Sequence, residues 1–194
     1  MKKTIRYVIG VDPSGNHHLQ KNEGDGTTGI AVYDREEDKI VHVAEIESSA
    51  FKEWQAFFKA TWIALTELLK MYPGVISIED YILYPSKSSQ QSWSHVPTAR
   101  LLGYILMECW LDGIDYYIRP AVDVKLRWTN DILLERGYIV GTDNEKSVGH
   151  CHGKTKLYVP GIDEPLKSHH LDAIRHAIHC GRLEIPKERG HLND

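Results

Sequence analysis

Three strand-like runs open the sequence before any helical period begins. They lie at residues 7–12, 27–33 and 39–46, where apolar residues are continuous or alternate with polar ones. The polar turn at residues 34–38 is short enough for an antiparallel hairpin. Residues 13–26 contain proline and several glycines and are expected to form a flexible loop. A start of this kind restricts the chain to folds whose sheet begins with antiparallel strands.

Helices and strands alternate in the rest of the chain. Apolar residues recur at helical spacing from Phe51 to Leu69, and we expect Ser48 and Ser49 to cap this helix. The further expected elements are a strand at 75–79, a loop at 84–96, a helix at 97–111, a strand at 115–119, a helix at about 121–136 that ends at Gly137, an irregular segment at 138–167 and a helix at 168–180. This order predicts the α/β class, with a mixed five-stranded sheet flanked by helices. The first three strands would be antiparallel, and the fourth and fifth parallel.

The length and composition are those of one globular domain. The chain has 194 residues, of which 42% are apolar and 26% charged. We expect a single domain over residues 1–185 and a flexible tail at 186–194. No apolar run approaches the roughly 20 residues of a membrane span, and no signal peptide is recognisable. Three widely spaced cysteines, Cys109, Cys151 and Cys180, provide no disulfide framework. These features predict a cytoplasmic protein without a membrane partner.

The distribution of charge matters more than its total. A net charge of −4 argues against a partner as acidic as nucleic acid. However, residues 1–80 hold 9 basic and 13 acidic side chains, whereas residues 81–194 hold 14 of each. The segments 81–107 and 146–161 contain basic residues and no acid. These two segments could form a local basic surface that contacts phosphates, or they could be ordinary solvated loops. Charge alone does not distinguish the two interpretations.

Two of the expected strands end on a carboxylate. Asp12 closes the first and Glu79 the fourth, and the carboxyl ends of neighbouring parallel strands meet at one edge of a sheet. Two carboxylates there would repel each other unless a cation lay between them, and such oxygen ligands suit Mg²⁺ or Mn²⁺. Asp80 is an alternative to Glu79, although strand alternation would turn it to the other face. In the simpler interpretation, Asp12 is a turn residue before Pro13 and Glu79 is a solvated strand end.

The last expected helix carries a third carboxylate. At about 100° per residue, His169, Asp172 and His176 share one face. Ala173 and Ala177 lie beside that face and would let the helix approach the sheet closely. The separate apolar stripe consists of Leu171, Ile174 and Ile178. The pattern indicates a helix that presents ligands, with ordinary surface polarity as the alternative.

Together these motifs resemble a known family. The segments Gly10-Val-Asp-Pro-Ser-Gly15, Gly29-Ile-Ala-Val-Tyr33, Ile78-Glu79 and Asp172-Ala-Ile-Arg-His-Ala-Ile178 resemble, in order, the motifs of the RuvC family of Holliday junction resolvases, within the RNase H-like superfamily. The resemblance implies an RNase H-like fold and an Mg²⁺-dependent endodeoxyribonuclease. It further implies two Mg²⁺ or Mn²⁺ ions per active site, branched DNA as the substrate in recombination and repair, and a homodimer.

The resemblance also assigns roles to particular residues. Asp12 matches the aspartate that bridges the metals, Glu79 the glutamate at the end of the fourth strand, and Asp172 the final aspartate of the C-terminal helix. His169 matches a position that holds aspartate or histidine three residues earlier, with His170 as the alternative if the helix register differs. All four matched residues are therefore expected to be catalytic and to bind metal.

DNA contacts follow from the same resemblance. Tyr81, Tyr84 and Lys87 match an aromatic and basic segment that engages the junction, although the tyrosines suit core packing equally well. Lys125 and Lys146 look like the basic residues that precede the last helix in the family. The segment around them is longer here, which leaves the choice of substrate more open than the nuclease chemistry. The consecutive His150, Cys151 and His152 do not have the spacing of zinc ligands and are expected to be loop residues.

Other functions share parts of this pattern. A sugar-kinase-like ATPase also begins with Gly-x-Asp, but it needs two such domains. A nucleic-acid-binding module without catalysis has no need for three carboxylates. Nucleases of RNA–DNA hybrids or of nonspecific DNA remain alternatives. Dimer contacts are expected on the helices at 51–69 or 101–111, and the small size favours a bacteriophage or bacterial enzyme.

Overall fold

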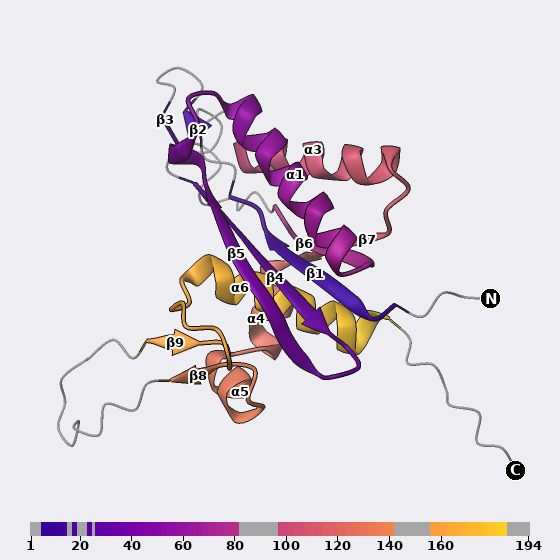
Figure 1. The fold of residues 1–194 in the computed structure, drawn as a ribbon, viewed down its shortest axis with the longest axis vertical. Helices are drawn as coiled ribbons and strands as arrows, with labels where there is room; N and C mark the ends of the chain where they lie inside the picture. The colour runs from indigo at the N-terminus through magenta and orange to yellow at the C-terminus, as the bar shows by residue number, and fades with distance from the viewer. Residues whose placement is uncertain are drawn as a thin grey trace, which may run out of the picture.

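A mixed five-stranded sheet forms the centre of the molecule. The structure, a computed structural model, describes residues 5–14, 17–18, 23–24, 26–81, 97–141 and 156–185. The strands follow the order β5-β4-β1-β6-β7 (Figure 1). Their bounds are Tyr7–Asp12 for β1, Thr27–Asp34 for β4, Lys39–Glu47 for β5, Gly74–Asp80 for β6 and Tyr116–Pro120 for β7.

The strand directions confirm the expected fold class. Strand β1 pairs antiparallel with β4, and β4 pairs antiparallel with β5 through the hairpin. Strand β1 pairs parallel with β6, and β6 with β7. The last parallel pair in register is Val11 with Ile78, so the next residue of each strand is the carboxylate, Asp12 or Glu79.

Helices cover both faces of this sheet (Figure 1). Helices α1 and α3 lie over one face, and α6 lies across β1, β4 and β6 on the other, next to α4. The helix bounds are Trp54–Met71 for α1, Pro97–Leu111 for α3, Ala121–Arg127 for α4, Asn130–Glu135 for α5 and Ser168–His179 for α6. Short elements complete the fold: β2 at His17–His18, β3 at Glu23–Gly24, η1 at Ser48–Ala50, β8 at Val140–Gly141, β9 at Leu157–Tyr158 and the π-turn η3 at Cys180–Glu184.

Strand alternation decides on which face the carboxylates lie. In β1, Ile9 and Val11 belong to the core under α1 and α3, whereas Val8 belongs to the core under α6. Strand β6 repeats the pattern, because Ile76 and Ile78 pack under α1 and α3 and Val75 packs under α6. Successive side chains alternate between faces, so Asp12 and Glu79 share the α6 face and Asp80 falls on the other.

Two glycines bring α6 against the sheet. A Cβ atom at Gly10 would lie 2.0 Å from the carbonyl oxygen of Ala173, and one at Gly29 would lie 2.2 Å from the carbonyl oxygen of His169. No side chain fits in either place. The helix backbone therefore rests directly on β1 and β4, as the small residues Ala173 and Ala177 led us to expect, and Asp172 comes within reach of the strand ends.

The expected cap of the first helix is wrong. Helix α1 begins at Trp54, and its N-cap, Glu53, makes no side-chain cap hydrogen bond. Ser48 is buried, and its Oγ accepts a hydrogen bond from the backbone N–H of Gly26 at 2.9 Å. Residues 48–50 form the short η1 turn instead. The serine that resembled a cap is therefore used to join the end of β5 to the start of β4.

The helix expected at 121–136 is two helices. Helix α4 ends at Arg127, and Thr129 caps α5 by accepting a hydrogen bond from the N–H of Ile132 at 3.3 Å. Trp128 lies between them and is only 4% exposed. Burial of this large ring turns the chain at a point where the apolar spacing alone would continue the helix. Gly137, with φ of 72°, follows α5 as expected.

The segments expected to be irregular contain short strands. Within 13–26, β2 pairs with β3, and within 138–167, β8 pairs with β9. The loop at 84–96, the tail at 186–194 and Cys151 lie outside the described residues. Cys109 and Cys180 are buried free thiols. Among the described residues, every helix is too short or too polar to span a membrane.

Candidate metal centre

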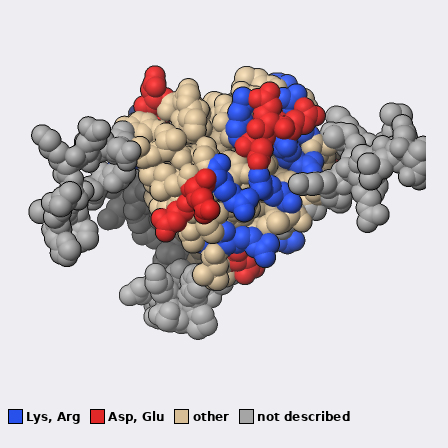
Figure 2. All heavy atoms as spheres, turned by 90° about the horizontal axis from the view of Figure 1, so that it is seen from below, with Lys and Arg blue, Asp and Glu red and all other residues tan. Residues whose placement is uncertain are grey.

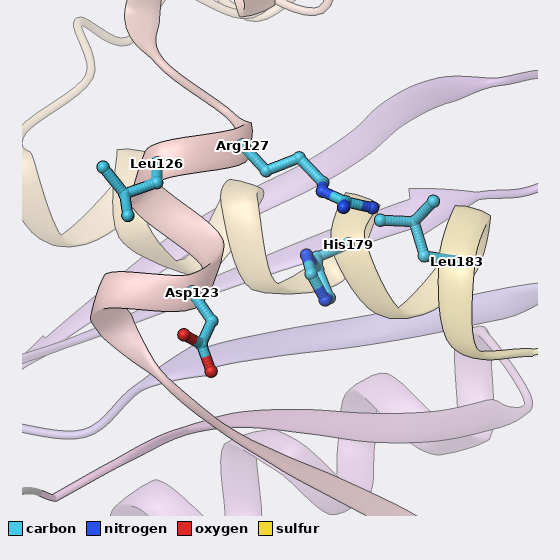
Figure 3. A pocket seen from close by; sticks show the side chains of 5 residues that line it. All are labelled: Asp123, Leu126, Arg127, His179 and Leu183. Carbon is cyan, nitrogen blue, oxygen red and sulfur yellow. The ribbon is translucent and has the colours of Figure 1, made fainter.

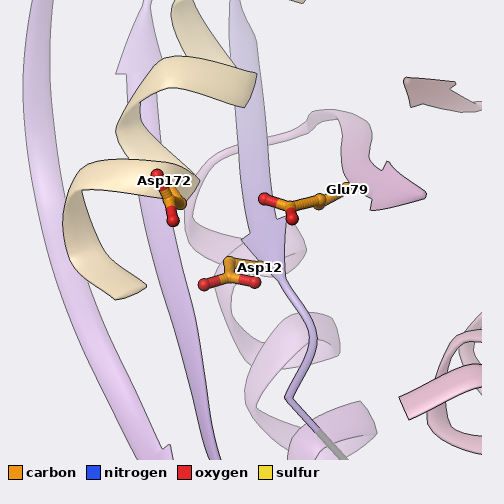
Figure 4. Close-up of side chains that lie close together, drawn as sticks. All are labelled: Asp12, Glu79 and Asp172. Atoms are coloured by element: carbon orange, nitrogen blue, oxygen red, sulfur yellow. The ribbon is translucent and has the colours of Figure 1, made fainter. Parts of the chain in front are cut away.

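Three carboxylates from three elements converge at one end of the sheet. Asp12 closes β1, Glu79 comes from β6, and Asp172 comes from α6 (Figure 4). One oxygen of each lies within 4.8 Å of one oxygen of the other two. Figure 4 shows the three carboxylate groups turned toward a common point. The three could therefore bind one metal ion together.

The chemistry of this donor set fits a hard divalent cation. Asp12 is 9% exposed, and the side chains of Glu79 and Asp172 are 19% and 14% exposed. Three carboxylates held this close and away from water repel one another strongly. In addition, Glu79 Oε2 is buried and has no hydrogen-bond partner among the described residues. Carboxylate oxygens are the ligands that Mg²⁺ and Mn²⁺ prefer, and a cation would satisfy both the charge and the unpaired oxygen.

His169 lies at the edge of this cluster. Its Nδ1 is 2.6 Å from Asp12 Oδ2, which is the distance of a charge-assisted hydrogen bond. The bond to Asp12 raises the pKa of His169 above its usual 6.5, and it outweighs the opposing effect of partial burial. For Asp12, burial is the largest influence and raises the pKa above 3.8, although the bond to His169 acts in the opposite direction.

His170 faces away from the cluster. It is fully buried, and its Nδ1 accepts the backbone N–H of Lys167 at 3.2 Å. Its Nε2 lies 3.8 Å from Glu45 Oε2, on β5. Burial lowers the pKa of this imidazole. Of the two histidines weighed from the sequence, His169 is the one beside the carboxylates.

Two further cations surround the carboxylates. Lys125 Nζ lies 2.8 Å from Asp172 Oδ2 and 3.9 Å from Glu79 Oε2. Burial works to lower the pKa of Lys125, but its hydrogen bond to Asp172 and the nearby charges raise it above 10.5 overall. Arg175 forms a close ion pair with Asp172 and donates to the carbonyl oxygen of Trp128 at 2.8 Å. These two residues hold Asp172 between α4 and the body of α6.

The His169–Asp12 pair predicts how stability depends on pH. Because folding raises the pKa of His169, its contribution is complete below the unfolded value of 6.5 and is lost as pH rises through the higher folded value. The melting temperature of the protein in EDTA is therefore expected to fall as the pH rises above about 6.5. The His169→Asn variant should show a flatter profile in the same thermal melts. Parallel profiles for the two proteins would contradict this assignment.

The residues proposed for DNA contact have different positions. Tyr81 is partly buried and packs against the core under α1 and α3, which is the simpler of its two expected roles. Lys125 lies on the carboxylate cluster itself. Tyr84, Lys87 and Lys146 lie outside the described residues, as does the His-Cys-His segment at 150–152.

Sequence reasoning missed two neighbours of the carboxylates. Arg175 pairs with Asp172, three residues earlier on α6. His176 Nε2 lies 3.4 Å from Glu79 Oε2. The available signal was the helical spacing, since residues three and four positions after Asp172 lie on the same side of the helix. The helical spacing places His176 on the same face as Asp172 but does not assign it a partner.

A pocket lies apart from the carboxylates. It has a volume of about 590 Å³ and lies between α4 and the end of α6 (Figure 3). The residues that line it are Asp123, Leu126, Arg127, His179 and Leu183. It includes none of the clustered carboxylates, so the candidate metal centre is not part of this pocket.

Comparison with known proteins places the fold. The sheet order, the helices on both faces and the carboxylates at the strand ends define a protein with the RNase H-like α/β fold. The structure of T. thermophilus RuvC in complex with a Holliday junction substrate is similar, with a TM-score of 0.60 and 17% sequence identity, over 91% of this chain and 93% of that one. No protein-family model and no curated protein matches the sequence. At this identity the similarity concerns the fold alone.

Proposed function

We propose that the protein is a metal-dependent endonuclease that hydrolyses phosphodiester bonds of branched DNA, and specifically a Holliday junction resolvase. The observation that carries the proposal is the convergence of Asp12, Glu79 and Asp172 within 4.8 Å. The similar RuvC structure was determined with a Holliday junction substrate, which supports the choice of DNA substrate.

In this proposal the three carboxylates and His169 hold two Mg²⁺ or Mn²⁺ ions. Such ions, when bound, activate a water molecule and stabilise the leaving oxygen of a phosphodiester. Asp12 links the two parts of the site, because it bonds to His169 and has an oxygen within 4.8 Å of one from each of the other two acids. Lys125 balances the charge of Glu79 and Asp172, and it is close enough to contact a phosphate that enters the site.

DNA contacts are proposed for residues that lie between β6 and α6 in the sequence. Tyr84 would stack on bases, and Lys87, Lys125 and Lys146 would meet phosphates. The net charge of −4 does not oppose this, because charge is unevenly distributed. On the side that carries α5 and the turn between β4 and β5, Lys and Arg lie among acidic side chains and pair with several of them (Figure 2).

We also propose a homodimer, since symmetric cleavage of a junction needs two sites. Helix α3 exposes Met107, Trp110 and Leu111, which are 56%, 73% and 61% exposed. Tryptophan and methionine are enriched at protein interfaces, and tryptophan residues often contribute most of the binding energy. We therefore assign the contact to α3.

The Trp110→Glu variant is expected to weaken dimerisation about 30-fold or more, since it places a charge at the centre of this surface. Light scattering over a concentration series measures the effect. Leu126→Glu is the matched control, because Leu126 is 76% exposed on α4, on the opposite side of the sheet. If both variants dimerise as the unchanged protein does, α3 is not the interface.

Cleavage of defined substrates tests the proposed function. The protein would be incubated with Mg²⁺ and a labelled four-way junction, beside linear duplex, a flap and an RNA–DNA hybrid. Paired symmetric nicks confined to the junction, and their loss in EDTA, are the expected result. Cleavage of the hybrid or of linear duplex would favour the other RNase H-like nucleases. Binding without cleavage on any substrate would favour an inactive binding module.

A further inference from the structure

The environment of His176 is unusual for a histidine. It lies on α6, one turn beyond Asp172, and is 1% exposed. Neither ring nitrogen has a hydrogen-bond partner among the described residues. Burying a polar group without a hydrogen-bond partner costs free energy. An apolar side chain would avoid that cost at a position whose neighbours, Ala173 and Ala177, are apolar and fully buried.

A second unpaired atom lies opposite this ring. Glu79 Oε2 is buried without a hydrogen bond among the described residues, and His176 Nε2 is 3.4 Å from it. The turn of α6 that carries the ring is fixed to the same strand, because Ser77 Oγ donates to the carbonyl oxygen of His176 at 3.0 Å. The backbone thus holds the imidazole beside the carboxylate of β6.

We propose that His176 is a positioning residue that orients Glu79 for metal binding. Its Nε2 lies 3.4 Å from Glu79 Oε2, so a small rotation of either side chain would let Nε2–H donate to this oxygen, which would keep another lone pair for a cation. Groups behind a metal ligand commonly fix its orientation, and their loss weakens metal affinity about 10- to 100-fold. The inference rests on the proposed function, since it requires Glu79 to be a metal ligand.

The test measures Mn²⁺ affinity by electron paramagnetic resonance, without any substrate. His176→Leu is expected to weaken binding about tenfold or more. His176→Gln, whose amide can donate from nearly the same position, should stay within about threefold of the unchanged protein. His42→Leu is the matched control, because His42 lies on β5 against Tyr72 at the end of α1, away from the carboxylates. It should leave Mn²⁺ binding unchanged. Thermal melts in EDTA confirm that each variant folds.

The outcomes separate this inference from the proposed function. If Glu79→Gln abolishes Mn²⁺ binding but folded His176→Leu binds normally, the positioning role of His176 is wrong and the metal centre stands. Equal losses of Mn²⁺ affinity in His176→Leu and His176→Gln would also contradict the positioning role, because metal binding would then not depend on a hydrogen-bond donor at this position. If Glu79→Gln binds Mn²⁺ normally, the proposed metal centre fails, and this inference fails with it.

Discussion

The Asp12→Asn variant is expected to lose Mg²⁺-dependent cleavage by at least about a thousandfold, as enzymes do when a group that acts directly on the reaction is removed. The amide removes one negative charge from the point where Glu79 and Asp172 converge. It should weaken Mn²⁺ binding for the same reason. Because burial raises the pKa of Asp12, the ionised carboxylate is unfavourable in the folded protein, and the variant should be at least as stable as the unchanged protein without metal.

Asp80→Asn is the matched control for this prediction. Asp80 also ends β6, but strand alternation turns it to the face opposite the cluster. Its replacement should leave cleavage within about threefold of the unchanged protein, since surface charges have small effects. Single-turnover rates on the same junction compare the two variants. Retained cleavage in Asp12→Asn would remove Asp12 from the proposed site.

Replacing Gly10 with valine is expected to prevent stable folding or to cost about 3 kcal/mol or more. The first added atom would lie 2.0 Å from the carbonyl oxygen of Ala173 and 2.7 Å from the backbone nitrogen of Ala177. Backbone atoms cannot move aside as a flexible side chain can, so α6 would have to leave the sheet. Urea unfolding, or the soluble yield when the protein does not fold, measures the effect.

Gly103→Ala gives the matched comparison with the opposite sign. Gly103 lies inside α3, and a Cβ atom there meets nothing within 4 Å. Alanine should stabilise the helix by about 0.5–1 kcal/mol, because it loses less backbone entropy on folding. If Gly10→Val had a free energy of unfolding as high as that of Gly103→Ala, α6 would not rest on β1 as described.

Much of the fold could be predicted because continuous or alternating apolar runs mark the strands. The runs at 7–12, 27–33 and 39–46 correspond closely to β1, β4 and β5. The errors arose where tertiary contacts override local preference. Ser48 has the residue type of a helix cap, but its hydroxyl bonds to Gly26 across the fold. Trp128 continues the helical spacing, but burial of its ring ends α4.

The candidate site could be predicted only in part, for a similar reason. Asp12 is the last residue of β1 and Glu79 the last but one of β6, so the parallel pairing of these strands places them together. Helical spacing then identifies Asp172. The contacts of Lys125 and Arg175 with Asp172 depend on how α4 packs against α6, which no local pattern encodes. The pairing of His176 with Glu79 likewise depends on the distance between α6 and β6.

The most direct test of the central claim is a crystal structure of the protein grown with Mn²⁺, with anomalous diffraction recorded to locate the metal. The account predicts anomalous peaks between Asp12, Glu79 and Asp172, with the carboxylate oxygens as ligands. Lys125 should move away from Asp172 as the cation takes its place. Manganese bound elsewhere, with the three carboxylates still paired only to Lys125, His169 and Arg175, would contradict the account.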